Sequence, residues 1–315
     1  MATTGNGKAL HKALKDEDAA RELLENLRWP NGAVCPHCGA DKPYKLTPKP
    51  GSKAPVRPGV YKCRACRKQF TVTVGTVMER SRVSLVVWVQ AFYLLCSSKK
   101  GFSAEQLRRH FGIDHKTAWF VGHRIREAMK REPMPGLLRG KVEADETYVG
   151  GKPRAYEPRR PGRPGPDSKK TPVLALVERG GNVRSFPIWQ GAVTGNNLKA
   201  AIREHVDPTS QLFTDELQAY KGLNREFASH EFVTHSEREY VRGDVHVNTA
   251  EGFFSILKRG INGVYHHVSP KHLERYLAEF DFRYNERFVS DGERTARAIR
   301  GAEGKRLMYR EPVNG

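Results

Sequence analysis

Apolar side chains recur every three or four positions in several stretches of the chain, which predicts amphipathic helices. The helix expected from Asn248 onward has its apolar stripe at Ala250, Phe254, Leu257 and Ile261. Glu251 and Lys258 fall on another side of this helix and point the same way. Asn248 followed three residues later by Glu251 also fits a capping box, which is common and needs no catalytic explanation.

Two further helices are predicted to be joined by a short turn. Ser103 can cap a helix that reaches about His110, and Asp114 can cap a second helix that runs to about Lys130. The second helix repeats Ala118, Val121, Ile125 and Met129 at core spacing, with Lys116, His123, Arg126 and Lys130 largely elsewhere. This spacing is typical of a helix-turn-helix, although a solvated basic helix pair would give a similar pattern.

The remaining helices are predicted near residues 16–27, 83–96 and 196–205 and from Ser269 onward. The apolar run 83–96 is short for a membrane span and contains Gln90, so it is interpreted as a core helix. The N-terminus lacks the apolar segment of a signal peptide. We therefore expect no membrane segment.

Strands are predicted where the periodicity changes to two or where β-branched residues cluster, at 141–149, 173–177, 183–189, 211–215 and 231–235. In the first strand, Glu143, Asp145 and Thr147 share a face that a half-buried strand would ordinarily keep uncharged. The fourth strand ends in Asp215, next to a helix expected near Glu216, a position that suits either an active site or a simple cap.

The order of these elements predicts an α/β fold, a ribonuclease H-like mixed sheet with flanking helices. Two regions are expected before this sheet. Residues 1–80 would form an N-terminal helix and a zinc ribbon, and residues 81–135 would form a helix-turn-helix domain. The catalytic domain would span 138–290 and the C-terminal tail 291–315.

Charge narrows the choice of partner. Lys and Arg number 54 against 35 Asp and Glu, a formal net charge of +19, which favours a polyanion such as nucleic acid. Residues 99–131 carry a net +6, and the Pro-rich segment 150–172, read as a basic loop, carries +5. No polybasic amphipathic helix points to a membrane surface instead.

Four of the five cysteines form two Cys-x2-Cys pairs, Cys35 with Cys38 and Cys63 with Cys66. Such pairs supply the four thiolates of a tetrahedral structural Zn²⁺ site, with a β-run expected at 70–74. The spacer of 24 residues is long, and 48–59 is interpreted as a hairpin extension within it. Cys96 is expected in the core. This cysteine usage suits a reducing cytoplasm.

The three acids Asp145, Asp215 and Glu251 lie on elements that adjoin in such a sheet. Carboxylate oxygens are the ligands that Mg²⁺ and Mn²⁺ prefer, and pairs of such ions promote phosphoryl transfer. The sequence thus predicts a second, catalytic metal site in addition to the zinc ribbon.

Nearly the whole chain resembles the DDE transposases of bacterial insertion sequences that carry an N-terminal zinc ribbon. The resemblance rests on LRWPNGAVCPHCGA, VEADETYVGGK, TDELQAY and the block from VHVNTAEGFFSILKRG to FRYNER. It implies Asp145, Asp215 and Glu251 as Mg²⁺ or Mn²⁺ ligands and Lys258 as a contact to the DNA end. Asn248, one turn before Glu251, is the alternative third ligand.

The resemblance further implies binding of terminal inverted repeats in double-stranded DNA, strand cleavage by water and transfer of the 3′-OH into target DNA. It also implies a dimer or larger assembly on DNA and a place in the cytoplasm with the nucleoid. Two other functions stay open: an inactive DNA-binding regulator derived from a transposase, and a ribonuclease H-like DNA nuclease. A regulator would have no reason to keep all three acids and Lys258, and a nuclease would have less use for end-recognition modules.

Overall fold

The computed structural model describes residues 3–47, 56–131, 136–150, 170–189 and 193–308. The chain divides into two compact units, residues 1–131 with 288–315 and residues 132–287. Most of the predicted basic loop 150–172 and of the hairpin extension 48–59 lies outside the described residues. Within the described ranges, no helix combines the length and apolar character needed to cross a membrane.

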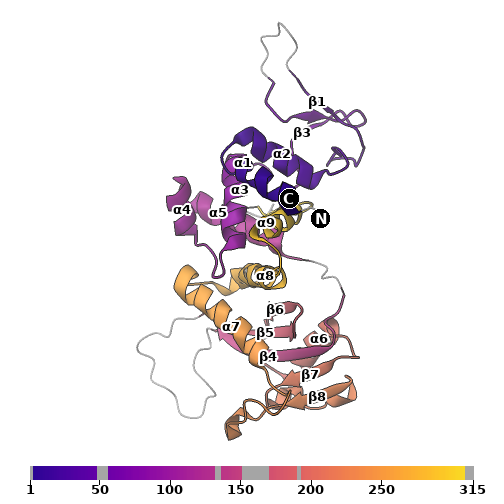
Figure 1. The fold of residues 1–315 in the computed structure, drawn as a ribbon, viewed down its shortest axis with the longest axis vertical. Helices are drawn as coiled ribbons and strands as arrows, with labels where there is room; N and C mark the ends of the chain where they lie inside the picture. Colours follow the sequence, from indigo (N-terminus) through magenta and orange to yellow (C-terminus); the bar gives the residue numbers. More distant parts are fainter. Residues whose placement is uncertain (1–2, 48–55, 132–135, 151–169, 190–192, 309–315) are drawn as a thin grey trace, which may run out of the picture. The chain divides into compact units, whose positions relative to one another are not determined.

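Helices make up most of the first unit (Figure 1). They are α1 Thr3–Ala13, α2 Glu17–Arg28, α3 Leu85–Ser97, α4 Ala104–Phe111, α5 His115–Met129 and α9 Asp291–Arg300. Asp16 caps α2, accepting a hydrogen bond from the Ala19 amide. Helix α3 is a core helix with Cys96 buried, as predicted. Helix α9 packs on α3, and Arg294 Nη1 donates to the Cys96 carbonyl at 3.1 Å.

Helices α4 and α5 form the predicted pair, joined by a turn in which Gly112 has a φ of 64°. Ser103 and Gln106 complete a capping box on α4, and Asp114 caps α5. The expectation that the basic residues of α5 stay outside the core is wrong for His123 and Arg126, which are buried. Helix α5 contacts α3 and α9 as well as α4, so its second half is enclosed on several sides.

Three strands of two residues each, β1 Tyr44–Lys45, β2 Tyr61–Lys62 and β3 Gln69–Phe70, form an antiparallel sheet in the first unit. The predicted β-run at 70–74 is wrong beyond Phe70, where the chain turns. Arg28 Nη1 donates to the carbonyls of Val72 and Val74, both at 2.7 Å. A guanidinium therefore takes the acceptors that a neighbouring strand would have used.

The second unit is built on a five-stranded mixed sheet in the order β6-β5-β4-β7-β8. Its strands are β4 Lys141–Val149, β5 Thr171–Glu178, β6 Val183–Pro187, β7 Gln211–Thr214 and β8 Ser229–Phe232. Strands β4 and β6 are both antiparallel to β5, whereas β7 lies parallel to β4 and β8 lies parallel to β7. If β4 to β8 are counted as the first to fifth strands of this sheet, their order is 3-2-1-4-5. This order, with the last two strands joining in parallel, confirms the ribonuclease H-like fold class.

Helices cover both faces of this sheet (Figure 1). Helix α7 Asn248–Gly260, its π-helical continuation Ile261–Tyr265 and α8 Pro270–Asn285 pack on one face. Helix α6 Gly195–His205 packs on the other, against Val142 and Ala144 of β4. The apolar stripe of α7, Ala250, Phe254, Leu257 and Ile261, is buried as predicted. This leaves the opposite side of α7 exposed.

The helix expected near Glu216 does not form, and β8 ends earlier than predicted. Residues Gln218–Tyr220 make a short 3-10 helix instead. The Glu216 carboxylate accepts hydrogen bonds from the amides of His235 and Ser236, at 2.7 and 3.0 Å. This side chain thus holds the 3-10 turn His235–Glu237, where the strand was expected to continue.

Candidate active site

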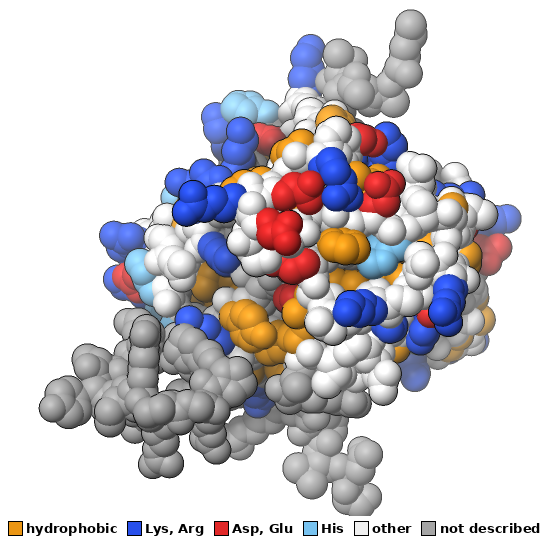
Figure 2. Space-filling view, turned by 90° about the horizontal axis from the view of Figure 1, so that it is seen from below, with side chains coloured by type: hydrophobic (Ala, Val, Ile, Leu, Met, Phe, Trp, Pro, Cys, Tyr) orange, Lys and Arg blue, Asp and Glu red, His pale blue; other side chains and the backbone are white. Residues whose placement is uncertain are grey.

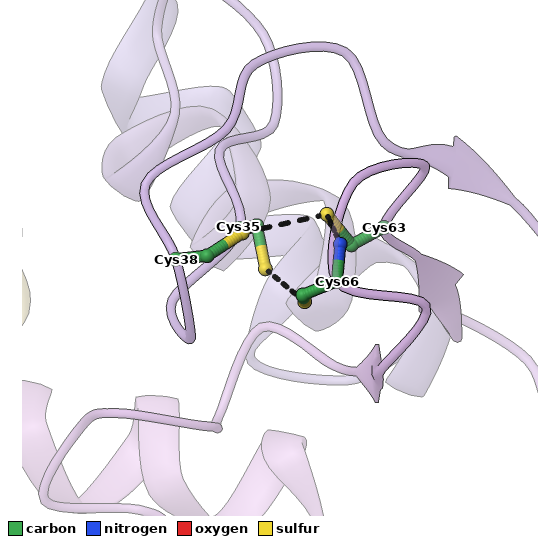
Figure 3. Close-up of side chains that lie close together, drawn as sticks. All are labelled: Cys35, Cys38, Cys63 and Cys66. Carbon is green, nitrogen blue, oxygen red and sulfur yellow. Dashed lines mark hydrogen bonds between the residues drawn. The ribbon is translucent and has the colours of Figure 1, made fainter.

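The four paired cysteines converge in the first unit (Figure 3). Their sulfur atoms all lie within 4.8 Å of one another, with Cys35 3.7 Å from Cys66 and Cys38 3.6 Å from Cys63. The Cys66 backbone amide donates to the Cys63 sulfur and, with smaller contributions, lowers the pKa of Cys63 to about 7. Four sulfurs at this spacing fit a tetrahedral Zn²⁺ with no coordination position left for chemistry.

Asp145 and Asp215 lie side by side, Asp145 on β4 and Asp215 directly after the end of the adjacent parallel strand β7. Glu143 of β4 pairs with Phe213 of β7, so Asp145 and Asp215 each come two residues beyond that pair. Glu251 lies in the first turn of α7, the helix that covers the Asp145 face of β4. The structure therefore brings all three predicted acids to one region of the second unit.

The charges of the neighbouring acids act on Asp145. The pKa of Asp145 is raised to about 7, chiefly by burial and then by the charges of Glu146, Asp215 and Glu251. Burial also raises the pKa of Asp215, and Glu216 adds to this rise. A group of carboxylates that oppose one another's ionisation is relieved by a bound cation.

The donor set fits a hard divalent cation, because it consists of carboxylate oxygens. Among the described residues, however, Asp145, Asp215 and Glu251 do not form a second cluster as tight as that of the cysteines. Figure 2 shows acidic side chains gathered near the middle of one face of the molecule, with Lys and Arg chiefly around them. The arrangement has the charge of a metal site with its ligands spread apart.

A fourth acid, Glu146, belongs to this region and was not predicted. Strand alternation sends its side chain to the α6 face of β4, where its Oε2 accepts from the Tyr220 hydroxyl at 2.5 Å. Burial raises the pKa of Glu146 to about 7, and the charge of Asp215 contributes to the rise. The adjacent acids at 145 and 146, which alternation sends to opposite faces of the strand, were the signal available in the sequence.

The start of α7 differs from the prediction. Asn248 is the first residue of the helix and not its cap, and the preceding residue, Val247, makes no side-chain capping bond. The expected capping box with Glu251 is therefore absent. Asn248, Glu251 and Lys258 are all exposed.

Comparison with known proteins agrees with the fold and with the cysteine cluster. The model of the ISXO2-like transposase domain matches residues 137–285, and that of the transposase zinc-ribbon domain matches residues 15–69. These matches define the chain as a transposase. It belongs to the insertion-sequence family that joins a zinc ribbon to an ISXO2-like transposase domain.

A relative from Halobacterium salinarum is 31% identical over 298 residues, which cover 91% of this chain and 97% of the relative. That relative is described as an uncharacterized protein in the transposable element ISH50.

Among solved structures, the simian T-cell lymphotropic virus intasome in complex with the PP2A regulatory subunit B56 gamma contains a chain that is 18% identical, with a TM-score of 0.26. That match covers 56% of this chain and 63% of the other, less than two thirds. The Mos1 strand transfer complex gives 15% identity and a TM-score of 0.26, covering 62% of this chain and 69% of the Mos1 chain.

Proposed function

We propose that this transposase binds the terminal inverted repeats of its element, cleaves the DNA strand there and transfers the resulting 3′-OH into target DNA. The observation that carries the proposal is the proximity of three acids, Asp145 on β4, Asp215 just after β7 and Glu251 in the first turn of α7, close enough for the charges of Asp215 and Glu251 to raise the pKa of Asp145. We propose these acids as ligands of Mg²⁺ or Mn²⁺.

When bound, the cation would supply Lewis acidity at the attacking and leaving oxygens of the phosphodiester. The three acids hold it, and Lys258 contacts the phosphates of the DNA end from the same face of α7. Cleavage and joining are then one reaction run twice, first with water and then with the 3′-OH as nucleophile, without a covalent enzyme intermediate.

End recognition is assigned to the first unit. Basic side chains exposed around the turn between α4 and α5 are Arg108, Arg109, His110, His115 and Lys116. The four cysteines hold Zn²⁺ and thereby keep the ribbon folded next to them in the chain. Because two ends must be joined in one event, the active form is a dimer or larger assembly on DNA.

Strand transfer in vitro tests this function. Labelled duplexes carrying the repeats that flank the gene are incubated with a supercoiled target and Mg²⁺ or Mn²⁺, and joined products are counted. We expect wild type to join ends, Glu251→Gln to lose about 10²-fold or more of the activity, and Asn248→Ala to retain it. Glu251 is favoured because its charge acts on Asp145.

Other outcomes of this assay identify the alternatives. If Asn248→Ala is the inactive variant, Asn248 replaces Glu251 as third ligand. Ends bound but never cut would favour a DNA-binding regulator, and cleavage of branched or unrelated DNA without joining would favour a nuclease.

End binding should weaken steeply with salt, because each phosphate that a Lys or Arg neutralises releases counterions. For roughly six phosphate contacts, affinity should fall by about five powers of ten per tenfold rise in salt. Lys116→Ala should reduce this slope by about one. Arg203→Ala, which removes an arginine already paired with Glu226, should leave the slope unchanged, and a flat salt response of wild type would contradict the assignment.

A further inference from the structure

The first turn of α7 obtains its hydrogen-bond acceptors from a distant strand. Glu143 Oε2 accepts from the backbone amides of Thr249 and Ala250, at 2.7 and 2.9 Å. Glu143 Oε1 accepts from the Thr249 hydroxyl at 2.9 Å. An acidic side chain at a helix N-terminus satisfies otherwise unpaired amides and interacts favourably with the helix dipole. Glu143 thus does for α7 what a local cap does for α2, α4, α5 and α9.

Glu143 is fully buried, with 0% of its surface exposed, so its carboxylate needs compensation. Arg179, in the turn between β5 and β6, supplies it through Nε at 2.6 Å from Glu143 Oε1. His246 Nδ1 lies 3.2 Å from the same oxygen. Both oxygens of Glu143 are therefore fully engaged.

Arg179 is itself held on several sides. Its Nη2 donates to the His246 carbonyl at 2.9 Å, and its Nη1 donates to the Asp244 carbonyl at 2.9 Å. Its guanidinium lies 4.3 Å from the centre of the Phe213 ring. A planar group fixed in this way acts as a rigid link between the chain before α7 and strand β7.

This network lies one or two residues from each proposed metal ligand. Glu143 precedes Asp145 by two residues on the same face of β4, and Phe213 precedes Asp215 by two residues across the end of β7. Ala250, which donates to Glu143, is followed by Glu251. One buried ion pair thereby connects the three elements that carry the acids.

We propose that Glu143 and Arg179 are positioning residues that set the place of α7, and with it Glu251, relative to Asp145 and Asp215. The proposal rests on the function proposed above for those three acids. Neither residue contacts the metal: they act through the elements that carry its ligands, as outer partners do in other metal sites. A carboxylate that only stabilised the fold would have no effect on metal affinity.

Glu143→Gln tests the proposal with little change in shape. Each carboxylate oxygen of Glu143 accepts from two donors. In either orientation of the glutamine side chain, the NH2 group would face two of these donors and could not accept their hydrogen bonds. We expect the Mn²⁺ concentration for half-maximal strand transfer to rise about 10- to 100-fold, with end binding unchanged. Calorimetric Mn²⁺ affinity should fall in parallel, and amide hydrogen exchange at 248–252 should accelerate. Glu226→Gln, at an exposed pair with Arg203, should change none of these quantities.

Milder variants keep the test valid if Glu143→Gln does not fold. Thr249→Val removes the hydroxyl bond alone, and Arg179→Lys keeps the charge without the fork; both should shift the Mn²⁺ dependence in the same direction by less. Wild-type Mn²⁺ dependence in the folded variants would overturn the proposal. If wild type neither binds Mn²⁺ nor joins strands, the proposed function fails, and hydrogen exchange decides the anchoring of α7 by itself: faster exchange at 248–252 upholds it and unchanged exchange overturns it.

Discussion

Replacing Asp145 with Asn is expected to reduce strand cleavage and joining by about 10³-fold or more while end binding remains intact. Asp145 lies on β4 beside the other acids, and the change removes one anionic ligand without altering side-chain size. Losing one group that stabilises transition-state charge typically costs about 10²- to 10³-fold, and a shared metal ligand costs at least as much. Single-turnover strand transfer at saturating Mg²⁺ measures the effect.

Stability separates a catalytic loss from misfolding in this variant. The folded-state pKa of Asp145, about 7, lies above its ordinary value of 3.8, so ionisation of the folded protein opposes folding. This penalty is absent near pH 3, grows between the ordinary value of 3.8 and about 7, and is constant at higher pH. Without added divalent cation, Asp145→Asn should therefore melt no lower than wild type at pH 8. At pH 4 the difference should be small.

Asp207→Asn provides a matched control for the same chemical change. Asp207 is half-buried, accepts from Thr209 and pairs with Arg139, away from the three acids in the sequence. It should join strands at the wild-type rate. Retention of more than about a tenth of the activity by Asp145→Asn would exclude Asp145 as an essential ligand.

Elements whose signals are local were predicted well. The predicted caps Ser103 and Asp114 each act within three residues of their own position. Strand alternation placed Glu143 and Asp145 on one face of β4. In these cases the interaction that fixes the structure lies within a few residues along the chain.

Predictions failed where a distant side chain supplies the partner. The pattern at Asn248 and Glu251 indicated a capping box, but the amides there bind Glu143, more than 100 residues earlier. Arg28 likewise ends the strand after Phe70, and Glu216 holds the turn at His235. Periodicity gives no information on such contacts, because they depend on tertiary structure.

The candidate site also combines residues that local patterns predicted with residues whose partners are distant in the sequence. Acids on a strand, at a strand's end and at a helix start were visible in the sequence, and the structure brings them to one region. Alternation could not distinguish the buried Glu143, which serves α7, from its neighbour Asp145 on the same face. It also gave no role to Glu146, whose partner Tyr220 lies 74 residues away.

Removing zinc should unfold the ribbon and abolish specific binding of the inverted repeats, while the second unit stays folded. The ribbon has three strands of two residues each, and its apolar contacts centre on Trp29, Tyr61 and Phe70, with ring centres 5.5 to 5.9 Å apart. So small a core cannot offset the entropy of ordering the chain. Structural Zn²⁺ supplies roughly 10–16 kcal/mol in comparable small domains.

Cys63→Ser should reproduce the effect of chelation, because it removes a ligand whose pKa already favours the thiolate. The outcome is measured by the zinc content, by end binding and by the protease resistance of residues 137–285, the transposase domain. Cys96→Ser is the matched control: Cys96 is buried in α3, outside the cluster, so this variant should keep its zinc and bind ends. Specific binding by zinc-free protein would show that the helix pair α4 and α5 recognises the repeats alone. The zinc ribbon would then act in a step of transposition other than recognition of the repeats, because its unfolding would not have weakened that recognition.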